Sequence, residues 1–320
     1  MSRHHLVAGG SGFIGSHLCD ELLRRGDTVT ALDNFATGRR TNVTHLLDHP
    51  RFRLIEHDIT VPLPESATAT SYDTVLDFAS PASPLDFRTM PLEILAVGST
   101  GTRNLLDLAT AQAARFMLAS TSEVYGDPLV HPQPESYLGN VDPIGPRSCY
   151  DEAKRFSEAI TMAYHRARGT DIRIARIFNT YGERMRPDDG RVVNAFIVAA
   201  LRGEPLQLFG DGSQTRSFCH VSDEVRGLLA VLDGDLTGPV NVGNPGEFTV
   251  AELAAIVVEL TGSTSPIVCA PLPFERTGDP NRRRPDISLI SSSYGWTPTV
   301  GLREGLDRMI RSYRDDEGIG

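Results

Sequence analysis

A glycine-rich stretch near the start of the chain constrains the fold more than any other feature. Gly9, Gly12 and Gly15 are spaced three residues apart, between an apolar run at residues 5–8 and an amphipathic stretch at residues 16–25. Glycines at this spacing allow a tight turn, the approach of a pyrophosphate to the amino end of a helix, and close packing of that helix on a strand. The stretch therefore predicts a strand, a loop and a helix that together bind a dinucleotide.

An acidic residue follows where the adenosine ribose of such a cofactor is bound. Asp33 ends the second candidate strand, eighteen residues after Gly15, and its carboxylate would accept hydrogen bonds from the ribose hydroxyls. Because a carboxylate would also repel a 2′-phosphate, the sequence favours NAD over NADP. Arg39 and Arg40 lie nearby and keep NADP open as an alternative, unless they simply begin a solvated helix.

Apolar and amphipathic segments alternate through the first half of the chain. The candidate strands are residues 5–8, 28–32, 53–56, 74–78, 115–120 and 171–177. Amphipathic stretches such as 16–25 and 101–111 separate them, which predicts an α/β fold with a doubly wound parallel sheet of the Rossmann type. We expect this domain to span residues 1–180, with residues 216–245 returning to it.

The pattern changes after about Tyr181, where proline and glycine interrupt the chain. Helices are expected there at residues 192–202, 250–260 and 302–312. Residues 181–215 and 246–320 are therefore predicted to form a smaller, irregular C-terminal lobe that binds the substrate.

Composition narrows the class of protein. The formal net charge of −10 argues against nucleic acid as a partner, because binding to phosphates requires an excess of lysine and arginine. The four cysteines form no C-x-x-C pair, so neither a zinc site nor a disulfide framework is indicated. No signal segment and no apolar run of membrane-spanning length is found, and we expect a cytoplasmic protein.

A single lysine, Lys154, stands among the 31 lysine and arginine residues. It lies four residues after Tyr150, and on a helix this spacing places both side chains on one face. A tyrosine with an ordinary pKa of about 10 is a poor base at neutral pH, but an adjacent ammonium together with the positive nicotinamide would favour its phenolate. Thr121, Ser122 and Glu123 follow the fifth candidate strand, so we expect them at the same sheet edge.

Two longer motifs contain these residues, and a third lies earlier in the chain. They are A-S-P-A-S-P at residues 79–84, T-S-E-V-Y-G-D-P at 121–128 and N-V-D-P-I-G-P-R-S-C-Y-D-E at 140–152. With these motifs the chain resembles, over essentially its whole length, the UDP-glucuronate decarboxylases of the extended short-chain dehydrogenase/reductase family. The resemblance implies conversion of UDP-glucuronate to UDP-xylose through a 4-keto intermediate, with NAD reduced and reoxidised in each turnover.

The resemblance also implies roles for individual residues. Tyr150 would be the base and Thr121 would share its hydrogen bond to the reacting hydroxyl, while Glu123 and Ser122 would serve decarboxylation and reprotonation. Related dehydratases carry an aspartate where this chain has Ser122, so dehydration is disfavoured. With Tyr150 and Lys154, the implied cofactor contacts are Gly9, Gly12, Phe13, Ile14, Gly15, Asp33, Asn34, Thr37, Gly38, Asp58, Ile59, Ala79, Ser80 and Pro81.

The C-terminal lobe is implied to hold the nucleotide sugar. Asn179, Arg191 and Arg216 would bind the diphosphate, Phe209 would flank the uracil, and Arg283 would lie near the substrate carboxylate. Without the resemblance, Arg283 would be interpreted as part of a solvated basic run.

The chain departs from the family pattern at two positions. Gly98 replaces the usual asparagine of an N-x-x-G-T motif, and Ala8 replaces a common threonine after the first strand. His45 and His49 are four residues apart and could face a metal, but no third ligand is indicated, so a surface helix ending before Pro50 is favoured and no metal is expected.

Three other functions stay open. The chain could be a UDP-sugar 4-epimerase, a decarboxylase that releases UDP-4-keto-pentose, or a regulator that binds NAD and a nucleotide sugar without catalysis. The complete set of Thr121, Glu123, Tyr150 and Lys154 disfavours the regulator. Related enzymes pair two long helices across a two-fold axis, so a homodimer through residues 101–111 and 151–168 is expected.

Overall fold

The computed structural model describes residues 2–271, 279–315 and 318–319, and within them seven strands form one parallel sheet. Its strand order is β11-β6-β5-β4-β1-β2-β3, with the order reversing between β1 and β4. The strands are β1 (His4–Ala8), β2 (Thr28–Asp33), β3 (Phe52–Glu56), β4 (Thr74–Asp77), β5 (Arg115–Thr121), β6 (Ile172–Ile177) and β11 (Val240–Val242). The predicted doubly wound α/β fold is confirmed.

The six predicted strands agree with the structure to within one residue at each end. The seventh, β11, lies in the segment that returns from the C-terminal half, and it pairs in parallel with β6 through Val240 and Ala175. The start of the first predicted helix was less accurate. Helix α1 (Phe13–Arg24) begins three residues earlier than predicted, because Gly12 in the glycine loop already caps it. The surface helix expected before Pro50 is a 3₁₀ helix, η1 (Arg40–Leu46), that ends sooner.

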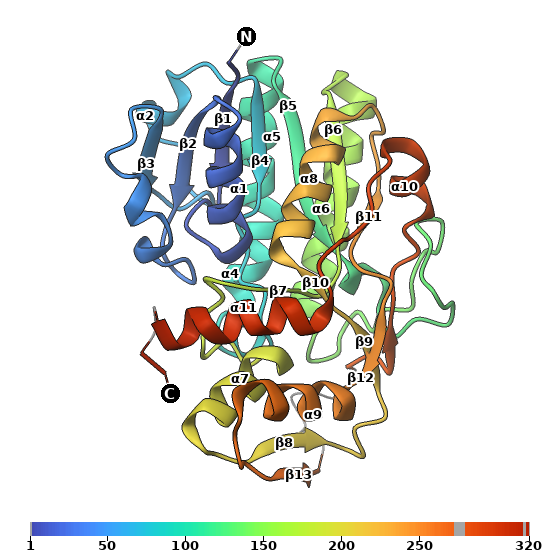
Figure 1. Ribbon diagram of the computed structural model, residues 1–320. Helices are drawn as coiled ribbons and strands as arrows, with labels where there is room; N and C mark the ends of the chain where they lie inside the picture. The colour runs from blue at the N-terminus through green and yellow to red at the C-terminus, as the bar shows by residue number, and fades with distance from the viewer. Residues whose placement is uncertain (1, 272–278, 316–317, 320) are drawn as a thin grey trace.

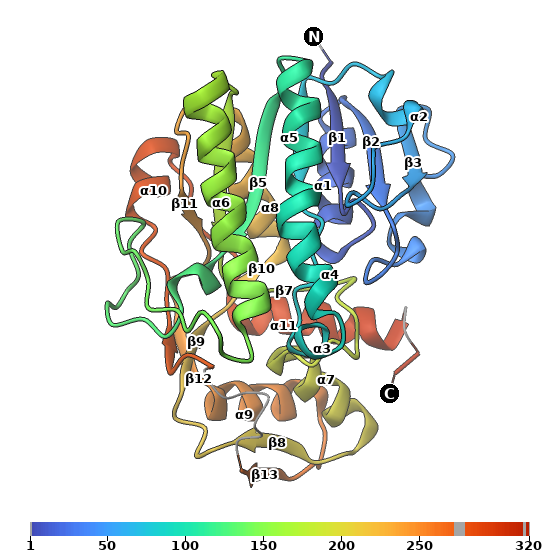
Figure 2. The same ribbon diagram turned by 180° about the vertical axis from the view of Figure 1, so that it is seen from behind.

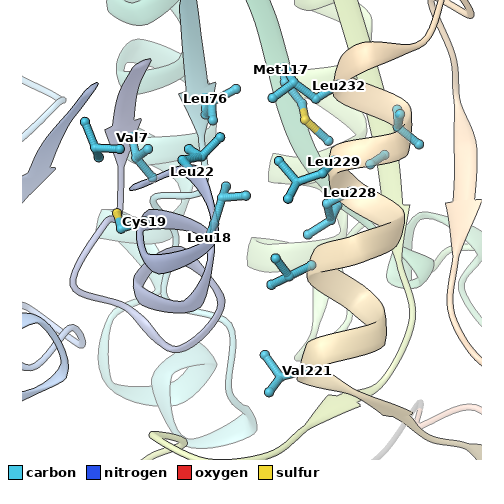
Figure 3. Close-up of a cluster of buried hydrophobic side chains, with 14 of the residues drawn as sticks. Val7, Leu18, Cys19, Leu22, Leu76, Met117, Val221, Leu228, Leu229 and Leu232 are labelled. Carbon is cyan, nitrogen blue, oxygen red and sulfur yellow. The ribbon is translucent and has the colours of Figure 1, made fainter. Parts of the chain in front are cut away.

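Helices cover both faces of the sheet. Helix α1 and α8 (Val221–Asp233) lie on the face seen in Figure 1, and α5 (Thr102–Ala111) and α6 (Ser148–Arg168) lie on the opposite face seen in Figure 2. Figure 3 shows Leu18 of α1 and Leu228 of α8 pointing into the same cluster, with Met117 of β5 above them near Leu232. Full burial of each such side chain contributes about 1.5–3 kcal/mol, so this cluster holds the helices on the sheet.

The smaller lobe lies below the carboxyl ends of the strands in Figure 1. Helices α7 (Val192–Arg202), α9 (Val250–Thr261) and α11 (Leu302–Asp315) share its core, in which Ile197, Leu253 and Leu306 are fully buried. The three helices lie where they were predicted, although α11 is longer at its end. Thr249 and Glu252 form a reciprocal capping box at the start of α9.

Short elements complete the lobe and its connections to the sheet. The strands are β7 (Thr180–Tyr181), β8 (Leu206–Phe209), β9 (Thr215–Ser217), β10 (Cys219–His220), β12 (Glu247–Thr249), β13 (Ile267–Ala270) and β14 (Arg282–Arg283). The remaining helices are α2 (Glu65–Thr68), α3 (Pro84–Thr89), α4 (Pro91–Ala96), a π-helical turn η2 (Val97–Gly101), η3 (Ser122–Tyr125) and α10 (Ser288–Tyr294). Within the described residues, no helix is long and apolar enough to cross a membrane.

Candidate active site

A cavity of about 870 Å³ lies between the carboxyl ends of the strands and the smaller lobe. Ligands of doubly wound sheets bind at this edge, where the strand order reverses. All residues that the sequence assigned to cofactor, catalysis and substrate line this cavity, although they come from segments spread between Gly9 and Arg283. The structure therefore brings the whole predicted set together.

The glycine loop forms the part of the cavity that suits a pyrophosphate. A Cβ atom on Gly15 would lie 2.1 Å from the Gly9 carbonyl oxygen, and one on Gly9 would lie 2.6 Å from that of Phe78. No side chain caps the amino end of α1, and its first turn carries no acidic residue. The loop thus leaves a helix amino end accessible to an anion, as a bound dinucleotide requires.

Asp33 lies at the end of β2 with its carboxylate fixed by the backbone. The amides of Ser11 and Phe35 each donate to it over 2.9 Å. Burial raises the pKa of Asp33, and these two amides oppose the rise by favouring the carboxylate. Neither Arg39 nor Arg40 is among the residues that line the cavity, so the arginines that kept NADP open are not part of the site.

Tyr150 lies in the first turn of α6, beside Thr121 at the end of β5. Its ring stacks on Phe87 of α3, with 4.8 Å between the ring centroids. Burial raises the pKa of Tyr150 to about 12, and the hydrogen bond with Thr121 and the charge of Arg191 oppose that rise only in part. The side chains around Tyr150 therefore favour its phenol form, and a positive charge bound in the cavity would favour the phenolate.

Lys154 lies one helical turn after Tyr150 and is fully enclosed. Its Nζ donates to the Ala119 carbonyl oxygen over 2.9 Å. Burial lowers the pKa of Lys154, and the carboxylates of Asp77 and Glu158 oppose this shift. The predicted pair on one helix face is thus present, with the ammonium anchored to the end of β5.

Glu123 is held by two arginines. Its Oε2 lies 2.7 Å from Nη2 of Arg147 and 3.2 Å from Nη2 of Arg283. Burial alone would raise the pKa of Glu123, but the charges of Arg283 and Arg147 outweigh it and lower the pKa to about 2. Arg283 also donates to the carbonyl oxygens of Ser122 and Gly126, so it is a buried part of the site and not a solvated surface residue.

The residues assigned to the nucleotide sugar surround the other end of the cavity. Arg216 of β9 is paired in register with Arg283 of β14. Burial, followed by the charge of Arg283, lowers the pKa of Arg216 to about 10. Arg191 precedes α7 and is held by Asp189 at 2.8 Å. Asn179 and Phe209 also line the cavity, so these residues could contact a diphosphate and a base.

Sequence reasoning assigned no role to several residues of the site. Arg147 joins Glu123 to Asp279, with 2.5 Å between its Nη1 and Asp279 Oδ1, and its guanidinium lies 5.3 Å from the Phe87 ring centroid. Its place three residues before Tyr150, in one of the quoted motifs, was a signal that could have been used. Phe87 carried no such signal, because only the fold places it on Tyr150.

An ion pair crosses the cavity between the two lobes. Arg186, in the loop before α7, lies 3.0 Å from Asp86 of α3. Both residues line the cavity, and Asp86 is also the third residue of the α3 capping box. No group of three or more His, Cys, Asp or Glu side chains in the described part of the chain is arranged to hold a metal ion.

A Rossmann sheet with a glycine loop, an enclosed Tyr150/Lys154 pair and an arginine-rich second lobe defines an NAD-dependent enzyme class. Residues 5–243 match the model of the NAD dependent epimerase/dehydratase family, and the chain belongs to this family.

Relatives within the family are more specific. The chain is 50% identical to UDP-glucuronic acid decarboxylase 1 of Arabidopsis thaliana over 98% of its own length and 72% of the relative. It is 49% identical to UDP-glucuronic acid decarboxylase 1 of Danio rerio, over 96% of this chain and 72% of that relative.

Solved structures extend the comparison to related activities. A UDP-glucuronic acid 4-epimerase from Bacillus cereus, in complex with UDP-glucuronic acid and NAD, is 28% identical with a TM-score of 0.87, covering 97% of this chain and 99% of that one. A dTDP-glucose 4,6-dehydratase from Streptomyces venezuelae with bound NAD is 30% identical with a TM-score of 0.86, covering 98% of both chains.

Proposed function

We propose that this protein decarboxylates UDP-glucuronate to UDP-xylose and uses NAD as a cofactor that is regenerated in each turnover. The observation that carries the proposal is the position of Arg283, buried beside Glu123 in the cavity that also holds Tyr150 and Thr121. An arginine that binds one carboxylate there can bind the carboxylate of a glucuronosyl group. The two relatives of about 50% identity support the same activity.

The residues of the cavity fit NAD, and different side chains carry out the separate proton transfers of the reaction. The glycine loop and Asp33 would hold NAD, which when bound would supply reversible two-electron acceptance at C4 of the sugar and positive charge in the cavity. Tyr150 takes the proton of the C4 hydroxyl, with Thr121 as its hydrogen-bond partner. The carboxyl group lies β to the C4 ketone. When CO₂ leaves, the electrons of the broken carbon–carbon bond pass onto the C4 oxygen and form an enolate, which Tyr150 and Thr121 then stabilise.

Glu123 is suited to the proton balance at C5. While Arg147 and Arg283 both hold it, its pKa is about 2 and it stays ionised. A substrate carboxylate that draws Arg283 away removes one of these charges, so the pKa of Glu123 rises and Glu123 can take up a proton from water. Once CO₂ has left, Arg283 returns to Glu123 and lowers its pKa again, so the proton passes to C5, directly or through water near Ser122. The arginines are thus proposed to link substrate binding to reprotonation.

We also propose that two copies associate through α5 and α6 and that the protein works in the cytoplasm. Phe156 of α6 and Leu95 of α4 are 48% and 40% exposed on this side of the sheet. Exposed apolar side chains on a helical face favour its burial against a second copy. The four cysteines are free thiols, as a reducing compartment requires.

The direct test incubates the protein with UDP-glucuronate and catalytic NAD⁺ and follows the sugar nucleotides by NMR. We expect UDP-xylose and CO₂ without net NADH, and a loss of at least about 100-fold in turnover for Tyr150→Phe. Tyr294→Phe is the matched control, because Tyr294 lies in α10, does not line the cavity, and its hydroxyl bonds to Leu236 and Asp235 after α8.

Other products would identify the alternatives. UDP-4-keto-pentose with stoichiometric NADH would show a decarboxylase that does not complete the final reduction. A 4-epimerised UDP-sugar with no CO₂ would overturn the proposal and favour the epimerase activity of the Bacillus cereus structural relative. Binding of both ligands without any turnover would indicate a regulator.

A further inference from the structure

The Lys154 ammonium lies in the protein interior. Its residue is 5% exposed, and the hydrogen bond that fixes it goes to a neutral group, the Ala119 carbonyl oxygen. An ammonium in such surroundings loses its proton unless a negative charge compensates its lost hydration. The charge state of Lys154 therefore depends on the groups that face it, and these come from α6 and from strands β4 and β5.

One of the two carboxylates that act on Lys154 is already neutralised. Glu158 lies one turn further along α6, and its two oxygens are 2.8 Å and 2.7 Å from Nε and Nη2 of Arg176. Ser120 donates to the same carboxylate over 2.6 Å. Because this bidentate pair matches the charge of Glu158, little of that charge is left to stabilise Lys154.

The second carboxylate, Asp77, is differently placed. It ends β4, is 1% exposed and pairs in register with Leu118, the residue before Ala119. Its Oδ2 accepts a hydrogen bond from Thr102 Oγ1 over 2.9 Å. The Ala79 amide also acts on this carboxylate, and Oδ1 makes no hydrogen bond of ordinary geometry within the described residues, so only neutral groups bind it directly.

Asp77 and Lys154 compensate each other. Burial raises the pKa of Asp77, and Lys154 is the charge that most opposes the rise. Burial lowers the pKa of Lys154, and Asp77 is first among the charges that oppose it. No ion pair within 4.0 Å joins the two residues in the part of the chain that the structure describes, so the attraction acts through the buried interior, where low polarity strengthens it.

Two hydroxyl groups, those of Thr102 and Ser157, lie between Asp77 and helix α6. Thr102 Oγ1, which binds Asp77, lies 3.4 Å from Ser157 Oγ, and Ser157 follows Lys154 by three residues on α6. Ser157 also donates to the Gly98 carbonyl oxygen over 2.7 Å. Asp77 is thereby fixed to the helix that carries Tyr150 and Lys154, although it is not among the residues that line the cavity.

We propose that Asp77 is the counter-charge that keeps the Lys154 ammonium protonated, and that it acts as a positioning residue for Tyr150 in the reaction proposed above. Asp77 acts through Lys154 and touches neither the sugar nor the dinucleotide. Tyr150 lies one turn before Lys154 on α6, so loss of the Lys154 charge should make its phenolate harder to form.

The single lysine of the chain allows a direct test. Protein grown with lysine labelled by ¹³C at Cε, carrying a lysine-free tag, gives one side-chain resonance whose shift reports the protonation of Lys154. In Asp77→Asn we expect the pKa of Lys154 to fall by about one unit or more. Asp73→Asn is the matched control, because Asp73 is exposed just before the same strand, and it should leave the titration unchanged.

The same variant has a kinetic signature. As the pH rises, Asp77→Asn should lose kcat at a lower pH than the wild type, by the same shift as in the NMR titration, with little change in KM. A folded Asp77→Asn protein with an unchanged Lys154 titration would overturn the proposal. The titration needs no turnover, so it stays informative even if the decarboxylase activity itself is not found.

A second variant covers the case in which Asp77→Asn does not fold. Thr102→Val keeps the side-chain volume and the Asp77 carboxyl group but removes the hydrogen bond that favours its ionised form. Lys154 should then titrate at lower pH than in the wild type, by less than in Asp77→Asn. An unchanged titration in Thr102→Val would equally overturn the proposal.

Discussion

At the scale of single residues, a hydrogen bond between Glu183 and His220 connects the two lobes. Glu183 begins the loop that carries Arg184 and Arg186 to the cavity, and its Oε2 lies 3.3 Å from Nε2 of His220. His220 caps α8 by accepting from the Ser222 amide. Burial would raise the pKa of Glu183, but the hydrogen bond with His220, a backbone hydrogen bond and the nearby histidines together outweigh it and lower the pKa to about 2.

This shift predicts a pH dependence of stability. Because the folded-state pKa of Glu183 lies below its unfolded value, its stabilisation is present above about pH 4.5 and is lost as the pH falls toward 2. Glu183→Gln should lower the free energy of unfolding by about 1–2 kcal/mol at pH 7, and the difference from the wild type should vanish near pH 2.

Urea unfolding between pH 2 and 7 measures this difference. Glu204→Gln, an exposed glutamate in the same lobe, should show no such dependence. A destabilisation of Glu183→Gln that stayed constant over the whole pH range would mean that packing, and not charge, explains it.

At the scale of elements, Gly98 determines how closely α4 and η2 approach α6. A Cβ atom at position 98 would lie 2.8 Å from Ala153 Cβ and 3.0 Å from the Ala153 carbonyl oxygen. Ala153 is the residue directly before Lys154 on α6. The glycine that departs from the family pattern is therefore required by close helix packing in this protein.

Gly98→Ala tests this packing. Alanine at an ordinary helical position stabilises by up to about 1 kcal/mol relative to glycine, whereas the contact with Ala153 should destabilise by about 1–3 kcal/mol. We expect a lower melting temperature and a lower kcat, because α6 must shift beside Tyr150 and Lys154.

Gly301→Ala is the control, since no atom lies within 4 Å of a Cβ there. If thermal unfolding showed Gly98→Ala to be as stable as the wild type, or more stable, then α6 would be able to shift without loss of stability.

At the scale of the whole molecule, the outer face of α5 and α6 is the proposed dimer interface. Phe156→Arg should convert a dimer to a monomer, because a guanidinium would replace an exposed apolar side chain of α6 in that face. Light scattering after size-exclusion chromatography measures the mass. Leu129→Arg, at a leucine that is 81% exposed outside these helices, should stay dimeric. A monomeric wild type, or a dimeric Phe156→Arg, would exclude this interface.

Much of the fold and the candidate site could be predicted because it depends on local order in the chain. Strand positions follow from short apolar runs, and the glycine spacing needs only one turn and one helix start. Tyr150 and Lys154 share a helix face through their spacing alone. Once β5, α6 and the glycine loop form a Rossmann unit, their carboxyl edge brings these residues to one cavity.

The remaining features were decided only in three dimensions. The sequence by itself determined the strands, the glycine loop and the Tyr150/Lys154 pair, since steric periods of two and 3.6 residues govern them. Packing between distant segments decided that Arg147 binds Glu123, that Arg186 reaches Asp86 across 100 positions, and that Asp77 faces the charge of Lys154. Such contacts depend on how whole elements are placed against one another, and no local pattern encodes that placement.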